Sequence, residues 1–85
     1  KADEALAIGL ADRVVAPEEL HDASLAWAAE LAAGPVQAIA LAKAAIDGAV
    51  TEQQAFTDVF RTADAEIGVQ SFLEHGPGKA TFTGR

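Results

Sequence analysis

The stretch at residues 36–50 is apolar almost all the way round a helix. Only three polar side chains interrupt it, at Gln37, Lys43 and Asp47. A helix that is apolar on every side must be covered on every side. The other helices of an 85-residue chain are too small to do that alone. We therefore expect this helix to pack partly against something outside the chain.

Short stretches before this one also have the pattern of helices. Residues 3–8 carry acids in the first turn, where the helix dipole favours them, and Gly9 follows as the expected end. The valines at 14–15 predict a brief extended segment. Pro17 suits the first position of a second helix, whose apolar stripe continues until Gly34 stops it.

Two threonines are expected to begin the remaining helices. Residues 51–54 (TEQQ) have the capping-box pattern, in which Thr51 and Gln54 bond reciprocally. Thr62 is the expected N-cap of a last helix. The Gly-Pro-Gly sequence at residues 76–78 ends that helix and should let the tail swing away. The pattern as a whole predicts an all-α chain.

The composition limits what such helices can bury and bind. Hydrophobic residues make up 51% of the chain, but many are alanines and aromatics are only 6%, so the core lacks bulk. The net charge of −7 repels phosphate backbones, so no nucleic-acid partner is expected. No apolar run approaches the roughly 20 residues of a membrane span, and no signal peptide is recognisable, so no membrane partner is expected. The absence of cysteine fits a reducing compartment, and we expect a cytoplasmic location.

Residues that carry chemistry are few. His21 and His75 lie far apart without the spacing of a metal site, so no metal is expected. His21 and Ser24 share a helix face, but a triad needs a third group and a pocket. The paired acids sit in helix first turns, where capping and the dipole explain them. We expect no catalytic residue in the chain.

Five segments with a recognisable pattern follow one another along the chain. They are ALAIGLADRVV (residues 5–15), PEEL (17–20), AAGP with ALAK (32–35 and 40–43), FRTAD with GV and FLE (60–64, 68–69 and 72–74), and GPGKATFTGR (76–85). In this order and at this spacing they resemble the enoyl-CoA hydratase/isomerase (crotonase) family. The resemblance covers essentially all of residues 1–85.

The resemblance implies a place for the chain within a larger fold. Residues 1–85 would form the all-helical C-terminal region that follows a spiral core of stacked β-β-α turns. This region packs on that core and on neighbouring subunits, in a homotrimer or a dimer of trimers. Such a place would account for a helix that is apolar on every side. The family's oxyanion-hole groups and catalytic glutamates belong to the core, whose motifs are not in this sequence.

The resemblance also implies three residues that contact coenzyme A, which is here part of the acyl-CoA substrate; no separate cofactor is expected. Phe56 aligns with an aromatic that lines the CoA or acyl pocket; the alternative is a core aromatic. His75 aligns where many relatives carry a lysine near the CoA phosphates. Lys79 is expected to replace that lysine; the alternative is a solvated lysine on the tail.

The implied function is a share in an enzyme that hydrates trans-2-enoyl-CoA to 3-hydroxyacyl-CoA, as in fatty-acid β-oxidation. The chain alone is expected to be inactive. Two alternatives stay open. An acidic binding module of the acyl-carrier type is one, because residues 22–25 (DASL) resemble the carrier motif, although Ala23 splits its Asp-Ser pair and Ser24 falls mid-helix. A purely structural oligomerisation segment is the other.

Overall fold

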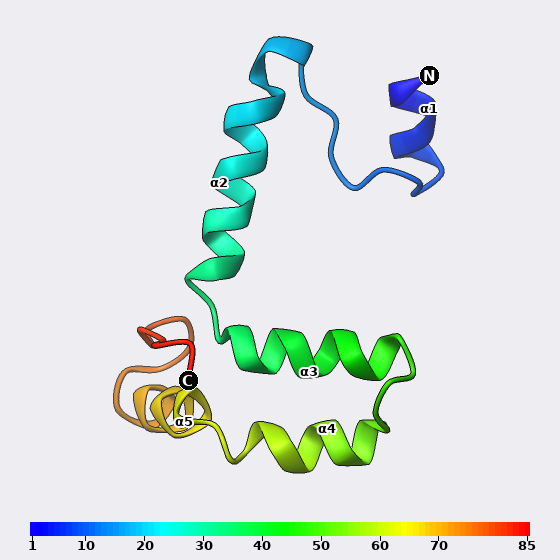
Figure 1. Cartoon of the computed structure of the whole chain (residues 1–85). Helices are drawn as coiled ribbons and strands as arrows, with labels where there is room; N and C mark the ends of the chain where they lie inside the picture. Colours follow the sequence, from blue (N-terminus) through cyan, green and yellow to red (C-terminus); the bar gives the residue numbers. More distant parts are fainter.

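The computed structural model describes all residues 1–85 and contains helices but no strand (Figure 1). The prediction of an all-helical chain is therefore confirmed. The elements are α1 (Ala2–Ala7), a 3-10 turn η1 (Pro17–Glu19), α2 (Leu20–Ala32), α3 (Val36–Ile46), α4 (Glu52–Val59) and α5 (Ala63–His75).

The helix ends follow local signals in the sequence, with one difference. Gly9 comes just after α1 with φ +75°, a conformation that costs a glycine little. The predicted helix over residues 36–50 ends four residues early, at Ile46, because Gly48 takes φ +74°. Just before that glycine, Lys43 Nζ donates to Asp47 Oδ2 at 2.7 Å across the last turn.

Threonine side chains cap the last two helices. Thr51 Oγ1 accepts from the Gln54 backbone N–H at 3.1 Å, and Thr62 Oγ1 accepts from that of Ala65 at 3.2 Å. The reciprocal half of the predicted capping box does not form. The Gln54 amide donates instead to Asp58 Oδ2 at 2.9 Å, one turn further along α4.

The segment between α1 and α2 is irregular. The predicted extended stretch at residues 14–15 forms no strand, because no neighbouring strand is there to pair with it. Arg13 holds this segment to α2, with its guanidinium carbon 4.1 Å from the centre of the Trp27 ring. Its Nη2 atom also lies 3.9 Å from Glu30 Oε2.

The helices are arranged as an open arm and a hairpin (Figure 1). The chain bends by 100° between Pro17–Ala32 and α3. Helices α3 and α4 then run side by side in opposite directions, and α1 stands apart from the others. No helix is by itself long and apolar enough to cross a membrane; only Pro17–Ala32 and α3, taken as a bent pair, have that length and composition.

The chain encloses almost no core. Only Ala55 and Asp64 are buried. The radius of gyration is 16.3 Å, against about 12 Å for a compact domain of this length. The accessible surface is 6775 Å², about 2,000 Å² more than a compact protein of this mass exposes.

Large apolar side chains are exposed along every helix. Ile46 is 85% exposed and Ile39 is 40% exposed, so the prediction that the chain cannot cover the α3 helix is confirmed. The others are Leu6, Ile8, Leu10, Val14, Val15, Leu20, Leu25, Leu31, Phe56, Phe60, Val69, Phe72 and Leu73. Each large aliphatic left in water forgoes about 1.5–3 kcal/mol of burial energy.

The Gly-Pro-Gly sequence predicted a C-terminal tail that swings away from the helices, and the structure contradicts this. After Gly76 it turns back and lies along α5 (Figure 1). The backbone N–H groups of Thr83 and Gly84 donate to the Asp64 carboxylate. The glycines at residues 76 and 78 do permit a mobile tail. The prediction was wrong because the Asp64 carboxylate, 19 residues before Thr83, holds the far end of the tail.

Candidate functional site

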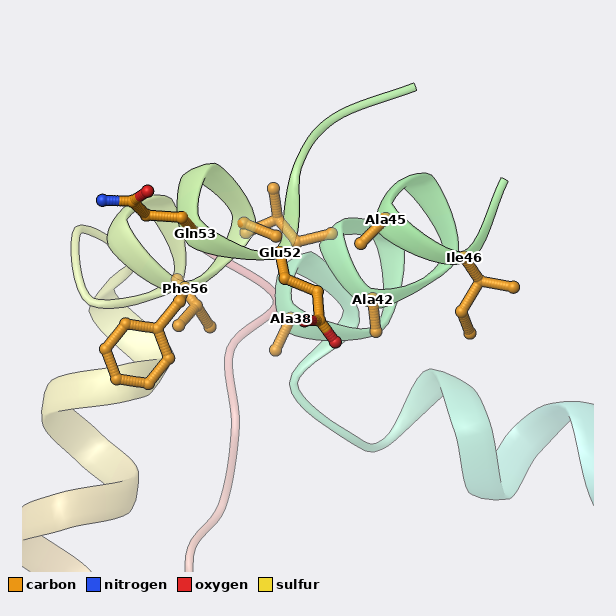
Figure 2. A pocket seen from close by; sticks show the side chains of 10 residues that line it. Ala38, Ala42, Ala45, Ile46, Glu52, Gln53 and Phe56 are labelled. Carbon is orange, nitrogen blue, oxygen red and sulfur yellow. The ribbon is translucent and has the colours of Figure 1, made fainter. Parts of the chain in front are cut away.

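An apolar groove lies between α3 and α4, with a volume of about 700 Å³ (Figure 2). Eight of its ten lining residues are hydrophobic. From α3 come Ala38, Leu41, Ala42, Ala45 and Ile46, and from α4 come Glu52, Gln53, Ala55, Phe56 and Val59. We call this hollow the α3–α4 groove.

The sequence builds this groove with small side chains. Ala38, Ala42 and Ala45 follow one another at spacings of four and three, so they share one face of α3. Methyl groups on this face leave room that larger side chains would fill. Phe56 and Ile46 project at opposite ends of the groove (Figure 2). The result is a shallow apolar trough with bulky groups at its two ends.

The alternative interpretation of Phe56 was an aromatic residue in the core. Within this chain Phe56 is not such a residue. Its side chain is 67% exposed. Its ring meets that of Phe60 edge-on, with 5.1 Å between the centroids. The structure thus leaves most of an aromatic ring exposed beside an apolar trough, where a flat or aliphatic group can pack.

A second hollow, of about 430 Å³, lies where the tail crosses the ends of α2 and α5. We call it the tail hollow. Lys79 lines it together with Phe72, Phe82 and the turn at residues 76–78. The Ser71 hydroxyl also faces this region and is enclosed without a hydrogen-bond partner.

The three predicted coenzyme A contacts do not share one hollow. Phe56 lines the α3–α4 groove and Lys79 lines the tail hollow. His75 is the last residue of α5 and is exposed, with its Nε2 atom 3.6 Å from Glu74 Oε2. A ligand that used all three would have to reach beyond either hollow.

No catalytic set is assembled within the chain. Ser24 Oγ donates to the Leu20 carbonyl of its own helix at 2.7 Å, in the middle of α2, and His21 is not its partner. No three or more His, Asp or Glu side chains converge as a metal site. The clearest electrostatic feature is Asp64, whose pKa is lowered mainly by the backbone N–H of Thr83, against the opposing effect of burial.

Known proteins are similar to this chain in sequence. The sequence model of the enoyl-CoA hydratase/isomerase family matches residues 1–85, which is the whole chain. The chain belongs to the enoyl-CoA hydratase/isomerase family. The family resemblance predicted from the segments is confirmed.

Curated family members share substantial identity with the chain. It is 45% identical over 65 residues to the probable enoyl-CoA hydratase EchA17 of Mycobacterium tuberculosis (strain ATCC 25618 / H37Rv), covering 76% of this chain and 21% of that protein. It is 41% identical over 68 residues to the probable enoyl-CoA hydratase echA17 of Mycolicibacterium paratuberculosis, covering 69% and 26%. It is 34% identical over 83 residues to the short-chain-enoyl-CoA hydratase of Clostridium acetobutylicum, covering 87% and 32%.

The chain is much shorter than these family members. Its matches span between 21% and 32% of their lengths. No solved structure matches the chain. Two thirds or more of each of these relatives has no counterpart in these 85 residues, and that part contributes to the activity of the whole protein.

Sequence reasoning missed two parts of the site. It did not single out the small-residue face of α3, although the spacing of Ala38, Ala42 and Ala45 is visible in the sequence. Asp64 is one of the paired acids that were explained by capping and the helix dipole, because nothing in the local pattern shows that Thr83 and Gly84 return to it.

Proposed function

We propose that the chain is the C-terminal helical region of a crotonase-like enoyl-CoA hydratase and works on a spiral β-β-α core that supplies the catalytic groups. The complete enzyme would hydrate trans-2-enoyl-CoA to 3-hydroxyacyl-CoA in the cytoplasm. Membership of the family and the wholly helical structure support this place. Coverage of about a third or less of each relative fits a chain that is one part of such an enzyme.

The observation that carries the proposal is the uncovered apolar surface. An excess of about 2,000 Å² on one chain is more than twice the roughly 800 Å² that each partner buries in a standard interface, and it falls in the range of large obligate interfaces. Exposed residues occur on α1, α2, α3, α4 and α5 alike, so one small partner would not cover them. A hydratase core on one side and neighbouring subunits of a homotrimer or dimer of trimers on the other would do so.

Within that assembly we assign the chain two kinds of coenzyme A contact. The exposed ring of Phe56 beside the α3–α4 groove would pack against the acyl chain or the pantetheine arm. Lys79 would offer a cation to a CoA phosphate, and His75 a second polar contact. A charge-assisted hydrogen bond of this kind contributes about 1.5–3 kcal/mol.

The reaction itself would be performed by groups outside this chain. In hydration of an enoyl thioester, backbone N–H groups of an oxyanion hole stabilise the enolate oxygen as water adds to the double bond. The helical region would hold the substrate and the subunits in place. We therefore expect that the 85-residue chain alone will not hydrate crotonyl-CoA faster than buffer does.

A chimera tests this proposal. The matching stretch of the Clostridium acetobutylicum hydratase is replaced by this chain, and crotonyl-CoA hydration and oligomeric mass are measured. We expect the chimera to keep the activity and mass of its parent, and a Gly/Ser segment of equal length to lose both. A Gly/Ser version as active as the chimera would contradict the proposal, and so would hydration by the chain alone.

Two substitutions in the chimera separate substrate contact from a purely structural segment. Phe56→Ala should raise KM about 10- to 100-fold with kcat nearly unchanged, because it removes binding shared by substrate and transition state. Leu73→Ala is the matched control for KM. Leu73 is 78% exposed and lines neither hollow, so its loss should leave KM unchanged, whereas as part of the uncovered apolar surface it should lower stability or oligomeric mass. Equal KM values for both variants and the unmodified chimera would reduce the chain to an oligomerisation segment.

A further inference from the structure

We infer that Asp64 is a positioning residue, whose carboxylate fastens the C-terminal tail to α5 and thereby sets where Lys79 lies. This inference rests on the proposed function only for the consequence at coenzyme A. The fastening itself is a property of the chain.

The Asp64 carboxylate uses both of its oxygens on the tail. Oδ1 accepts from the Thr83 backbone N–H at 2.7 Å and from the Thr83 hydroxyl at 2.9 Å, and Oδ2 accepts from the Gly84 N–H at 2.8 Å. The backbone N–H of Asp64 donates in turn to the Arg85 carbonyl at 2.9 Å. One residue thus holds three consecutive tail residues.

Asp64 is also the most buried residue of an otherwise open chain, at 2% exposed. Burial of a charge is unfavourable unless hydrogen bonds compensate it. The Thr83 backbone N–H and the other tail donors lower the pKa of Asp64, so the carboxylate is ionised at neutral pH. Its hydrogen bonds are therefore of the charge-assisted kind, which are stronger than neutral ones.

Two further contacts fit the tail to its place. The Phe82 ring lies over Gly68 of α5, where a Cβ atom would approach the ring to 3.4 Å. The Gly84 carbonyl accepts from Gln37 Nε2 at 3.4 Å, which joins the tail to α3. The tail therefore bridges α5 and α3 through the Phe82 ring and the Gln37 hydrogen bond.

The position of Lys79 depends on this far end of the tail. Gly76 and Gly78 have positive φ and bring little stiffness to the turn before Lys79. Thr83 comes four residues after Lys79, a separation of at most about 14 Å even in an extended chain. With Thr83 fastened, Lys79 stays within this distance of Thr83 and beside the tail hollow that it lines; without it, only the glycine-rich turn restrains the lysine.

The test uses Asp64→Asn, which keeps the shape but removes the charge and turns one acceptor into a donor facing Gly84. The matched control is Glu66→Gln, in the same first turn and without a tail contact. In the 85-residue chain, tryptic cleavage after Lys79 should rise about 10-fold or more in Asp64→Asn and less than twofold in the control. Equal cleavage in both variants would overturn the fastening.

Gly84→Ala provides an independent way to loosen the tail. Gly84 has φ +78°, and a Cβ there would lie 3.2 Å from Val36 Cγ2. This variant leaves Asp64 intact and should raise cleavage after Lys79 as Asp64→Asn does. Unchanged cleavage in Gly84→Ala together with faster cleavage in Asp64→Asn would mean that Asp64 acts on α5 and not through the tail, which would also overturn the inference.

Kinetics in the chimera separate this inference from the proposed function. Asp64→Asn should raise KM for a CoA thioester several-fold, leave kcat unchanged and leave KM for a pantetheine thioester unchanged. Lys79→Ala should do the same. Faster cleavage with no change of KM in Asp64→Asn, while Lys79→Ala does raise KM, would overturn the positioning role. No change of KM in either variant would refute the coenzyme A contact and leave the fastening standing.

Discussion

The first 35 residues and the last 50 differ in what holds them in shape. The first part contains no buried residue, and a single arginine on Trp27 ties its loop to α2. The last part contains both buried residues, a hairpin of α3 and α4, and a tail fastened to Asp64. Both parts nevertheless expose large apolar side chains.

This difference separates two sources of structure. Apolar burial is non-directional, so a helix such as α2 takes its final position from whatever surface covers it. Hydrogen bonds to Asp64 and side-chain caps at Thr51 and Thr62 define positions within the chain itself. The last 50 residues therefore carry contacts that fix their geometry within the chain, whereas the first 35 have few such contacts.

Amide hydrogen exchange of the isolated chain is the strongest test of this comparison. We expect amides of α5 and the tail to exchange about 100-fold more slowly than those of α1 and α2, because the buried Asp64 carboxylate ties α5 and the tail together and no buried residue holds α1 or α2. Mass spectrometry of peptides from each part measures this, with ultracentrifugation to report self-association. Equal protection in a compact monomer would show that the first part needs no partner.

The same contrast explains which features the sequence predicts. Helix starts at Thr51 and Thr62 depend on contacts within four residues, so local patterns reveal them, whereas the turn at Gly48 was missed because the apolar pattern continues past it. The contact between Asp64 and Thr83 spans 19 residues and follows no periodic pattern. The uncovered α3 helix was predictable because its apolar residues outnumber what so short a chain can cover. The groove beside it required knowing that α4 returns along α3.

Acid should release the tail and leave the first part unaffected. The pKa of Asp64 in the folded chain lies below its usual value of 3.8, so its stabilising effect is complete above pH 3.8 and is lost as the pH falls through the lowered value. Tail amides followed by NMR between pH 2 and pH 7 should lose protection only in the acid part of that range. In Asp64→Asn this step should be absent; a tail transition near neutral pH would contradict the assignment.

Removing a cap should matter in α5 and not in α2. Thr62→Ala deletes the acceptor for the Ala65 N–H and should cost about 1 kcal/mol of α5 stability, seen as faster amide exchange in that helix. Ser24→Ala is the comparison, because its hydroxyl only bonds back to Leu20 within α2 and its loss should change stability by less than about 0.5 kcal/mol. Equal losses of stability in Thr62→Ala and Ser24→Ala would contradict this prediction, because α2 would then depend on its local hydrogen bond as much as α5 does.

The smallest expected effect concerns the single tie in the first part. Trp27 is the only tryptophan, so all tryptophan fluorescence comes from the ring that Arg13 contacts. Arg13→Ala should increase quenching of Trp27 by acrylamide and lower the stability by about 0.5–1 kcal/mol, which is the strength of an exposed cation–π pair.

Glu30→Gln is the control for this substitution. Arg13 and Glu30 are both exposed and 3.9 Å apart, and such ion pairs contribute little. If Glu30→Gln matched Arg13→Ala, the ion pair and not the ring would hold the loop. If Arg13→Ala also loosened the tail amides, the two parts would be coupled and the distinction between them would fail.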